Sequence, residues 1–271
     1  VQRVVVNQMH RSPGVFFDHD KGKTHASGKL LFNCRVIPNR GSWLDFEYDV
    51  KDFLYFKIDR KKKILASTLL LALGYSKQEI ANEFYENEKY GFDPKVEKWK
   101  TKFNPENYKA KNFSEEVIDA KTGKVVIKRG EKINFLNAKK LANEGLKDIF
   151  VTKDSLYGKF LHNDVKLSNE ENSTLKIGTE LNETIVQQIV DANINSIQVS
   201  TTNSINKGPY LLTTIFNDKN NTKDEAITEI YKMLRPGEPP TIEIATQIFN
   251  NLFFSSDRYD LSDVGRVKMN S

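Results

Sequence analysis

Several residue types are scarce in this 271-residue sequence, and each scarcity excludes a class of protein. Cys34 is the only cysteine, so no internal disulfide framework can form, and a reducing, cytoplasmic setting fits. We expect Cys34 to be a small buried residue of a strand rather than a nucleophile. Glycine and proline number 14 and 8, too few for a collagen-like or low-complexity chain. No run of about 18 apolar residues occurs, which excludes a transmembrane helix.

The sequence also lacks the common catalytic and cofactor-binding motifs. It has no Gly-x-x-x-x-Gly-Lys-Ser/Thr phosphate loop, no Gly-x-Gly-x-x-Gly and no Asp-x-Asp-Gly-Asp run to hold magnesium. Its four histidines and one cysteine have no zinc-ligand spacing. His10, His19 and His25 lie near Asp18 and Asp20, but exposed turn residues explain this group better than a metal site does. We expect no catalytic residue, no metal site and no cofactor in these 271 residues.

The positive charge is concentrated near the start of the chain. The net charge is +5, and residues 1–84 alone carry 14 Lys and Arg against 9 Asp and Glu. The last segment, 208–271, carries 7 against 9. A nucleic-acid-binding surface is therefore expected mainly in the first third. The sequence opens in a strand-like run, Val4-Val5-Val6, and has no initiator methionine, so we interpret it as a fragment of a longer protein.

The first third predicts an antiparallel β-meander followed by two helices. Turn-forming residues separate four segments rich in β-branched and aromatic residues: 15–17, 29–37, 42–49 and 53–58. The apolar run 64–73 stops at Gly74, which is typical of a helix with glycine after its last residue. Ser76-Lys77-Gln78-Glu79 has the capping-box pattern and predicts a second helix through about Tyr85.

The middle of the chain contains an internal repeat. We expect 86–120 to be mostly irregular, with a few short strands, because it is polar and weakly periodic. The pattern around Gly130 then returns 48 residues later around Gly178, and each copy predicts strand, glycine turn, short helix, left-handed residue and strand. We interpret the copies, about 123–161 and 172–211, as a duplicated unit that packs as a compact insert.

The last stretch predicts two helices joined by a stiff loop. Apolar residues at spacings of three and four predict a helix over 223–234, and Thr241 is expected to cap another helix through about Phe254. Between them, Arg235-Pro236-Gly237-Glu238-Pro239-Pro240 cannot be helical, since its prolines remove backbone donors. The loop is either a plain linker or a rigid contact finger. Residues 255–271 are expected to be a loop with a short extended end.

Basic and aromatic residues of the first third suggest contact with nucleic acid. Arg11 lies in a stiff Pro-Gly loop, Arg40 and Trp43 lie at a hairpin turn, and Arg60 opens the run Arg60-Lys61-Lys62-Lys63. Arginine contacts phosphates, and an exposed tryptophan offers a stacking surface for an unpaired base. The alternative is a solvated charged rim with Trp43 packed in the core.

Longer phrases carry the most specific signal: Val6 to Asp18, Asp20 to His25, Arg40 to Glu47, Met233 to Thr241, and Asp257 to Ser262 with Val264-Gly265-Arg266. These phrases resemble the β subunit of bacterial RNA polymerase. They occur in the order of that family and cover about 1–84 and 208–271. The residues between, 85–207, resemble more loosely the lineage-specific insertion that many proteobacterial β subunits carry here.

The resemblance implies an α+β fold: an antiparallel, β-rich lobe with helices, formed by 1–84 and 208–271 and interrupted by the inserted domain 85–207. The parent enzyme extends RNA by DNA-templated nucleotidyl transfer with two magnesium ions, which in this family the β′ subunit holds. The fragment would line the DNA cleft and would be inactive alone. Implied partners are DNA (downstream duplex and non-template strand) and the α, β′ and σ subunits, in the cytoplasm with the nucleoid and away from membranes.

The resemblance also implies roles for individual residues. Arg11 would contact non-template DNA, and Trp43 would stack on an unpaired non-template base. Further DNA contacts are expected from Arg40, Arg60 and Arg258. The loop of Arg235, Pro236, Gly237, Glu238, Pro239 and Pro240 resembles the gate loop, which faces the clamp across the channel entrance. Val6 and Gln8 would lie at the outer edge of the rifamycin pocket.

Two other functions stay open. A stand-alone single-stranded-DNA-binding module would bind DNA by itself in a salt-dependent way, whereas a lobe without its opposing jaw would bind weakly. Alternatively, the insert 85–207 would be the working part, as a docking platform for σ or a regulator.

Overall fold

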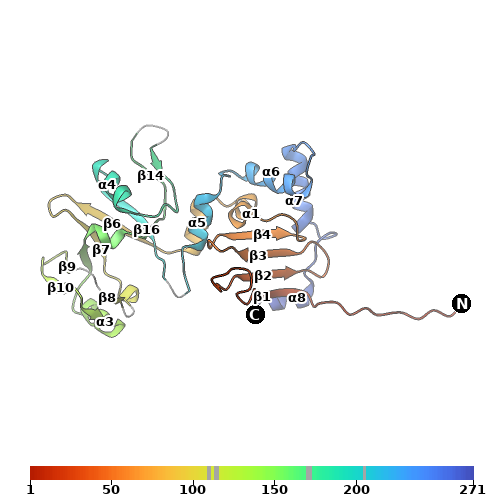
Figure 1. Ribbon diagram of the computed structural model, residues 1–271, viewed down its shortest axis with the longest axis horizontal. Helices are drawn as coiled ribbons and strands as arrows, with labels where there is room; N and C mark the ends of the chain where they lie inside the picture. The colour runs from red at the N-terminus through yellow and green to blue at the C-terminus, as the bar shows by residue number, and fades with distance from the viewer. Residues whose placement is uncertain (109–110, 113–115, 169–172, 204–205) are drawn as a thin grey trace. The chain divides into compact units, whose positions relative to one another are not determined.

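The computed structural model describes residues 1–108, 111–112, 116–168, 173–203 and 206–271. The fold is α+β, as predicted, with antiparallel sheets and eight α-helices among the described residues (Figure 1). The chain divides into two compact units: unit 1 comprises 1–77 and 217–271, and unit 2 comprises 78–216. The predicted domain boundaries, near residues 84 and 208, stay a prediction.

Unit 1 is built on a five-stranded antiparallel meander, which confirms the four predicted strands; the fifth strand takes the first two residues, 64–65, of the run predicted to be helical. Its strands follow chain order: β1 (Gly14–His19), β2 (Phe32–Ile37), β3 (Leu44–Tyr48), β4 (Leu54–Ile58) and β5 (Ile64–Leu65). Short polar side chains form the turns. The Asp20 carboxylate accepts backbone N–H groups of Gly22 and Leu31, and Asp49 accepts those of Lys51 and Phe53.

Helices complete unit 1: α1 (Ala66–Ala72), α6 (Lys223–Leu234), α7 (Ile242–Phe253) and α8 (Ser262–Asn270). α1 packs against β4 and α6, α6 packs against α7, and α8 lies beside β1 (Figure 1). Gly74, with φ +105°, follows α1 as expected. The start of α6 is fixed by a capping box, in which Thr222 and Glu225 satisfy each other's backbone N–H groups.

Two expectations for unit 1 are wrong. Residues 255–271 are not a loop with an extended end, because 262–270 form α8. Helix α8 contacts Pro13 through Gly265, where an added Cβ would lie 3.3 Å from Pro13. Because a glycine forms this contact, the sequence of α8 shows no apolar periodicity. The run Val4-Val5-Val6 is not in a strand. Residues 1–12 form no helix or strand, and these valines are at least 86% exposed.

Unit 2 is built on a seven-stranded antiparallel sheet in the order β10-β9-β12-β7-β6-β16-β13. Its strands are β6 (Asn87–Asp93), β7 (Lys98–Lys102), β9 (Val117–Asp119), β10 (Val125–Ile127), β12 (Asp148–Val151), β13 (Phe160–Leu161) and β16 (Ser196–Ser200). Two smaller ladders pair β8 (Lys111–Asn112) with β11 (Lys132–Ile133), and β14 (Val165–Lys166) with β15 (Thr174–Leu175). The helices are α2 (Lys77–Phe84), α3 (Phe135–Asn143), α4 (Glu183–Asp191), α5 (Tyr210–Asn217) and the 3-10 turns η1 (Pro105–Tyr108) and η2 (Lys153–Leu156).

The prediction that 86–120 is mostly irregular is wrong. β6 and β7 lie in the middle of the large sheet, and Trp99 of β7 is 1% exposed. The segment reads as polar because every second residue of β7 is lysine, while Trp99 and Thr101 face the core. Part of the predicted irregular segment, 109–110 and 113–115, lies outside the described residues.

The two segments around Gly130 and Gly178 share a strand, a glycine turn, a helix and a strand in that order, but the first also contains β11 between its glycine and its helix. Both glycines have positive φ, +81° and +82°, and a helix follows each. Asn134 and Asn182, again 48 residues apart, cap these helices, each accepting a backbone N–H with its side chain. The later phrases differ, because Phe160 and Leu161 form strand β13 whereas Tyr210 begins helix α5. Residues 172 and 204–205 of the second span lie outside the described residues.

The core of unit 2 lies on one face of its sheet. Buried strand residues such as Tyr90, Ile149 and Ile197 share one cluster with Ala138 of α3 and Ile189 of α4. The opposite face carries the polar side chains of the same strands. No helix in the described parts of the chain is long and apolar enough to cross a bilayer.

Candidate nucleic-acid interface

Cationic and aromatic side chains meet on one face of the unit 1 sheet. Strand pairing places Phe16 of β1 opposite Arg35 of β2, and Arg35 opposite Asp45 of β3. Trp43 directly precedes β3 and is half-buried, so it lies outside the buried core of unit 1. The guanidinium carbons of Arg35 and Arg60 lie 5.6 and 5.7 Å from the Trp43 ring centroid. Both distances allow cation–π attraction, so two positive charges lie beside the Trp43 ring.

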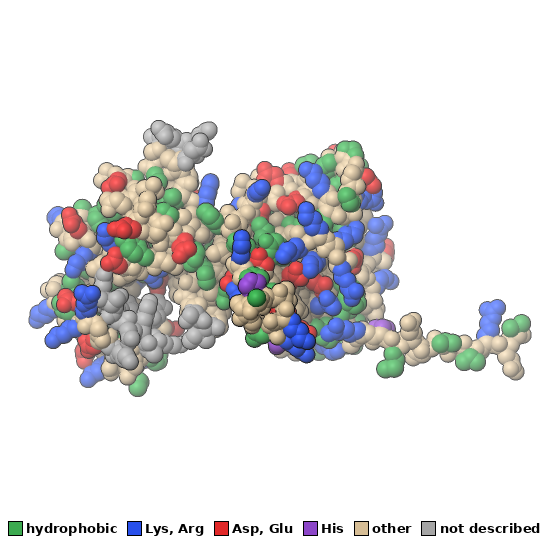
Figure 2. All heavy atoms as spheres, viewed as in Figure 1, with side chains coloured by type: hydrophobic (Ala, Val, Ile, Leu, Met, Phe, Trp, Pro, Cys, Tyr) green, Lys and Arg blue, Asp and Glu red, His purple; other side chains and the backbone are tan. Residues whose placement is uncertain are grey.

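Arg11 joins the same face through Phe16. Its guanidinium carbon lies 4.0 Å from the Phe16 ring centroid, and Lys268 approaches the same ring at 6.0 Å. The structure therefore brings together three of the predicted DNA-binding residues, and we call the set of Arg11, Phe16, Arg35, Trp43 and Arg60 the arginine–aromatic row. On the visible face of unit 1, basic side chains are numerous and acidic ones lie among them (Figure 2).

Asp45 fixes the position of Arg35 within the row. Its carboxylate accepts Nε of Arg35 at 2.6 Å and Nη2 at 3.3 Å, and Asp45 is only 8% exposed. These hydrogen bonds raise the pKa of Arg35 above its ordinary value. The two-point contact sets the plane of the guanidinium as well as its position.

Arg40 and Arg258 form a second group at the β2–β3 turn. Nη2 of Arg40 donates to the Ser256 carbonyl at 3.0 Å, and Arg40 pairs with Asp260 in an isolated β-bridge. Arg258 lies next to Gly41, whose added Cβ would be 3.1 Å from the Arg258 carbonyl oxygen. The guanidinium of Arg40 thus ties the turn to the segment before α8, while Arg258 itself is exposed.

The loop Arg235 to Pro240 is non-helical and exposed, as predicted. Nη1 of Arg235 lies 3.2 Å from Oε2 of Glu238, and the Tyr231 hydroxyl donates to the same oxygen at 3.0 Å. These hydrogen bonds, from Arg235 and then Tyr231, lower the pKa of Glu238. Nζ of Lys61 also donates to the carbonyl of Leu234, so the basic run at 60–63 braces the start of the loop.

Other candidate residues take no part in these groups. Val6 and Gln8 are exposed in the segment 1–12. Among the described residues, no three His, Cys, Asp or Glu side chains gather in a way that could hold a metal ion. Cys34 is half-buried in β2, and burial raises the pKa of its thiol. Asp20 serves the β1–β2 turn rather than a histidine site.

Sequence reasoning missed Arg35 and Phe16, which complete the row. A signal was present, because side chains of a strand alternate between its faces and antiparallel partners share a face. Using it requires the register of β1, β2 and β3, which the motifs alone do not supply.

Comparison with known proteins gives the family. The model of the family described as RNA polymerase Rpb2, domain 2, matches residues 11–174 and 180–271. The chain belongs to this family. The Rpb2 domain 2 match includes the whole arginine–aromatic row, the loop 235–240 and Arg258, and it runs through both units.

Individual relatives agree with the Rpb2 assignment. The DNA-directed RNA polymerase subunit beta of Rickettsia prowazekii is 47% identical over 270 residues, covering 100% of this chain and 20% of that protein. The subunit of the same name from Dinoroseobacter shibae is 46% identical over 282 residues, covering 99% of this chain and 20% of that protein. The chain thus spans about a fifth of the length of these curated relatives, and the resemblance to the bacterial β subunit is confirmed.

Proposed function

We propose that the chain is part of the β subunit of a bacterial DNA-directed RNA polymerase, in which unit 1 guides DNA through the cleft. The parent enzyme would perform nucleotidyl transfer together with α, β′ and σ subunits, in the cytoplasm with the nucleoid. Its magnesium ions would be bound by β′, and this part would do no chemistry. Support comes from the family match and from the 47% identity over the full chain.

The observation that carries the proposal is the arginine–aromatic row. Arginines contact phosphates and so fix the position of a strand, while an aromatic ring stacks on any base without reading its identity. Asp45 holds Arg35 in place before DNA arrives, so less side-chain freedom is lost on binding. In this proposal Arg11, Arg35 and Arg60 contact the non-template backbone, and Trp43 stacks on an unpaired base.

The remaining site residues have secondary roles in the proposal. The loop 235–240 acts as the gate, with Arg235 and Glu238 meeting DNA or the clamp once their mutual ion pair opens. An exposed pair of this kind is weak, so DNA or a protein charge can replace either partner. Arg40 and Arg258 line the edge of the DNA path, and Val6 and Gln8 border the rifamycin pocket. The lobe would comprise 1–84 with 208–271, and the insert 85–207.

Replacing Trp43 by alanine in the full β subunit tests the proposal. Polymerase is reconstituted with α, β′, σ and either wild-type or variant β, and the lifetime of open promoter complexes is measured against a competitor. Loss of one stacked base costs about 1–3 kcal/mol, so the lifetime should fall about 5- to 150-fold. Phe17→Ala is the matched control, because Phe17 is an exposed aromatic residue of β1 next to Phe16.

Two results would contradict the proposal. An unchanged lifetime for Trp43→Ala would remove the stacking role, and an equal loss in Phe17→Ala would show that the effect is not specific to the row. If a full-length β subunit that contains this unmodified sequence supported no RNA synthesis with α, β′ and σ, the assignment to the polymerase would itself be wrong.

A further inference from the structure

The face of the unit 2 sheet opposite its core is rich in lysine. In β7, Trp99 and Thr101 are buried, so Lys98, Lys100 and Lys102, which alternate with them, point to the opposite face. Lys89 of β6 lies on this face too, because it alternates with the buried Tyr90. We call this the outward face. Lys89, Lys100 and Lys102 are exposed and Lys98 is half-buried.

An aromatic ring lies among these lysines. Phe150 of β12 pairs directly with Lys100, and Lys100 pairs on its other side with Gly91. Gly91 has no side chain to cover Lys100 on that side. Phe150 is half-buried, so part of its ring is available to a ligand. Four lysines and one aromatic residue on the same face of a sheet are features that proteins use to bind single-stranded nucleic acid.

Acidic residues only partly offset the charge. Asp148 lies 3.4 Å from Nζ of Lys100, with the two side chains 39% and 50% exposed, and Asp93 pairs with Lys98 across β6 and β7. Exposed ion pairs of this kind add little stability, so a phosphate can replace the carboxylate. Counting the four lysines against these two aspartates and Glu86, which lines a hollow at the end of this face, leaves a net charge of +1.

The spacing of the β7 lysines suits a nucleic-acid backbone. Alternate residues of a strand are about 6.8 Å apart, since each residue advances the strand by about 3.4 Å. Successive phosphates of an extended single strand are separated by a whole sugar–phosphate repeat, which is a spacing of the same order; the rise of about 3.4 Å per charge applies along the axis of a stacked helix. Successive phosphates of an extended strand running along β7 would therefore lie opposite Lys98, Lys100 and Lys102.

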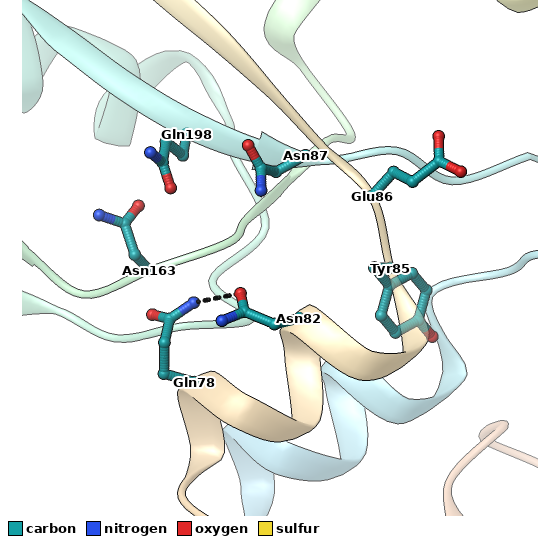
Figure 3. Close-up of a pocket in the computed structure, with 7 residues that line it drawn as sticks. All are labelled: Gln78, Asn82, Tyr85, Glu86, Asn87, Asn163 and Gln198. Atoms are coloured by element: carbon teal, nitrogen blue, oxygen red, sulfur yellow. Dashed lines mark hydrogen bonds between the residues drawn. The ribbon is translucent and has the colours of Figure 1, made fainter.

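A hollow lined with carboxamides opens at the β6–β16 end of this face (Figure 3). Gln198, which pairs with Lys89, and Asn87 come from the sheet, whereas Gln78 and Asn82 come from α2. The lining residues are Gln78, Asn82, Tyr85, Glu86, Asn87, Asn163 and Gln198.

Internal hydrogen bonds orient the amides of the hollow. Nε2 of Gln78 donates to Oδ1 of Asn82 at 3.1 Å and to the carbonyl of His162 at 2.9 Å. Nε2 of His162 also lies 2.8 Å from Oδ1 of Asn82, so this oxygen is occupied and the Asn82 amide hydrogens remain for a ligand. Among the described residues, Oδ1 of Asn163 is buried and accepts no hydrogen bond. Oriented amide donors and acceptors suit the edge of a base.

We propose that the outward face of unit 2 binds single-stranded nucleic acid, with the lysines on its phosphates, Phe150 against a base and the amide hollow receiving the edge of an unstacked base. No cation lines the hollow among the described residues, so the phosphates would be bound by the lysines of the outward face. This site is independent of the function proposed for unit 1.

The test measures how the affinity of the 271-residue chain for a labelled single-stranded oligonucleotide depends on salt. Fluorescence anisotropy with a dT oligomer of about 20 residues, between about 25 and 200 mM NaCl, gives the slope of log K against log salt. The slope is negative, and its magnitude should decrease by about 0.7 for each lost phosphate contact. Replacing all four lysines by glutamine should therefore make the slope shallower by about 2.8. Phe150→Leu should weaken binding about fivefold and leave the slope unchanged.

The matched control replaces four other exposed lysines of unit 2 by glutamine: Lys128, Lys140, Lys153 and Lys166. Lys153 carries an exposed ion pair at 3.4 Å, as Lys100 does. Equal slopes for the two quadruple variants, or no measurable binding by the wild-type chain at the lowest salt, would overturn the inference. Competition by poly-glutamate gives a further test. If it displaces the oligonucleotide as effectively as DNA does at equal charge, the face binds acidic polypeptides in general and the inference is wrong.

The same measurement in a chain that also carries Trp43→Ala and Arg60→Ala separates the two sites. If the lysine variants change the slope in both backgrounds, the outward face binds by itself. If only the unit 1 substitutions reduce binding, this inference is wrong and the function proposed for unit 1 is untouched.

Discussion

Replacing Asp45 by asparagine tests whether one buried carboxylate keeps the arginine–aromatic row in shape. Asp45 accepts two hydrogen bonds from Arg35, at 2.6 and 3.3 Å, and its side chain is 11% exposed. Asparagine preserves the size of the side chain but removes its charge and replaces one acceptor oxygen by an amide donor. That donor would face the guanidinium, so Arg35 would lose its two-point contact beside Trp43.

The expected loss follows from the burial of the two partners. A hydrogen bond to a charged group contributes about 1.5–3 kcal/mol when it is shielded from water. The Arg35 side chain stays 35% exposed, so water recovers part of its solvation after the substitution. We therefore expect Asp45→Asn to lower the free energy of unfolding of unit 1 by about 1–2 kcal/mol.

The two tryptophans make this loss measurable for unit 1 alone. Trp43 lies in unit 1 and Trp99 in unit 2, so Trp99→Phe leaves Trp43 fluorescence as the reporter. Urea denaturation should show a lower midpoint with an unchanged slope. The control is Glu47→Gln, which breaks the Lys57–Glu47 pair at 2.7 Å, and it should cost less than about 1 kcal/mol because both side chains are about 30% exposed. If Asp45→Asn costs no more than Glu47→Gln, Asp45 does not hold Arg35 as argued.

Two further predictions concern the turn at Gly41 and the loop at 235–240. Gly41 has φ +128°, and an added Cβ would lie 2.5 Å from the Tyr259 ring, so Gly41→Ala should cost more than about 1 kcal/mol and expose 255–260 to protease. An unchanged urea midpoint would contradict this. Contacts from Arg235 and Tyr231 lower the pKa of Glu238 below its ordinary 4.5, so they are complete above about pH 4.5 and are lost as the pH falls through the lowered value. Amide hydrogen exchange of the loop, measured as a function of pH, gives the pH at which these contacts are half lost. Arg235→Gln should raise that pH, and an unchanged value would show that Arg235 does not lower the pKa of Glu238.

The local elements of unit 1 could be predicted because short sequence signals decide them. Asp20 and Asp49 form turns within a few residues of themselves, and the capping box of Thr222 with Glu225 starts α6 at its predicted first residue, Lys223. Each of these contacts spans fewer than about a dozen residues, so composition and spacing carry the information. The antiparallel meander then follows, since consecutive strands joined by short turns pair with each other.

The errors lie where distant partners decide the structure. β6 is stabilised by β16, more than 100 residues away along the chain, and its own sequence is polar enough to read as irregular. The alternation Lys98-Trp99-Lys100-Thr101-Lys102 was a usable strand signal that the polar composition hid. α8 escaped prediction because Gly265 forms its contact with Pro13, and a glycine adds nothing to a hydrophobic pattern.

Three of the five members of the arginine–aromatic row could be predicted from the sequence, but its arrangement could not. Arg11, Trp43 and Arg60 stood out from their motifs, but nothing in those motifs says that they share a sheet face. Arg35 supplies that link, because it pairs with Phe16 across β1 and β2 and also approaches the Trp43 ring. A shift of one residue in that register would turn Arg35 to the other face and separate the row into unrelated residues.

The two units place similar chemistry on their sheets by the same rule of alternation. In unit 1 the row combines three arginines with Phe16 and Trp43, and in unit 2 the outward face combines four lysines with Phe150. The difference between the cations matters. The arginine held by Asp45 is fixed in orientation, which suits a strand that must be held in one place, whereas flexible lysines act as point charges and suit a strand that slides. Salt should therefore weaken the lysine face with a slope set by charge alone, while Trp43→Ala should lower affinity at every salt concentration.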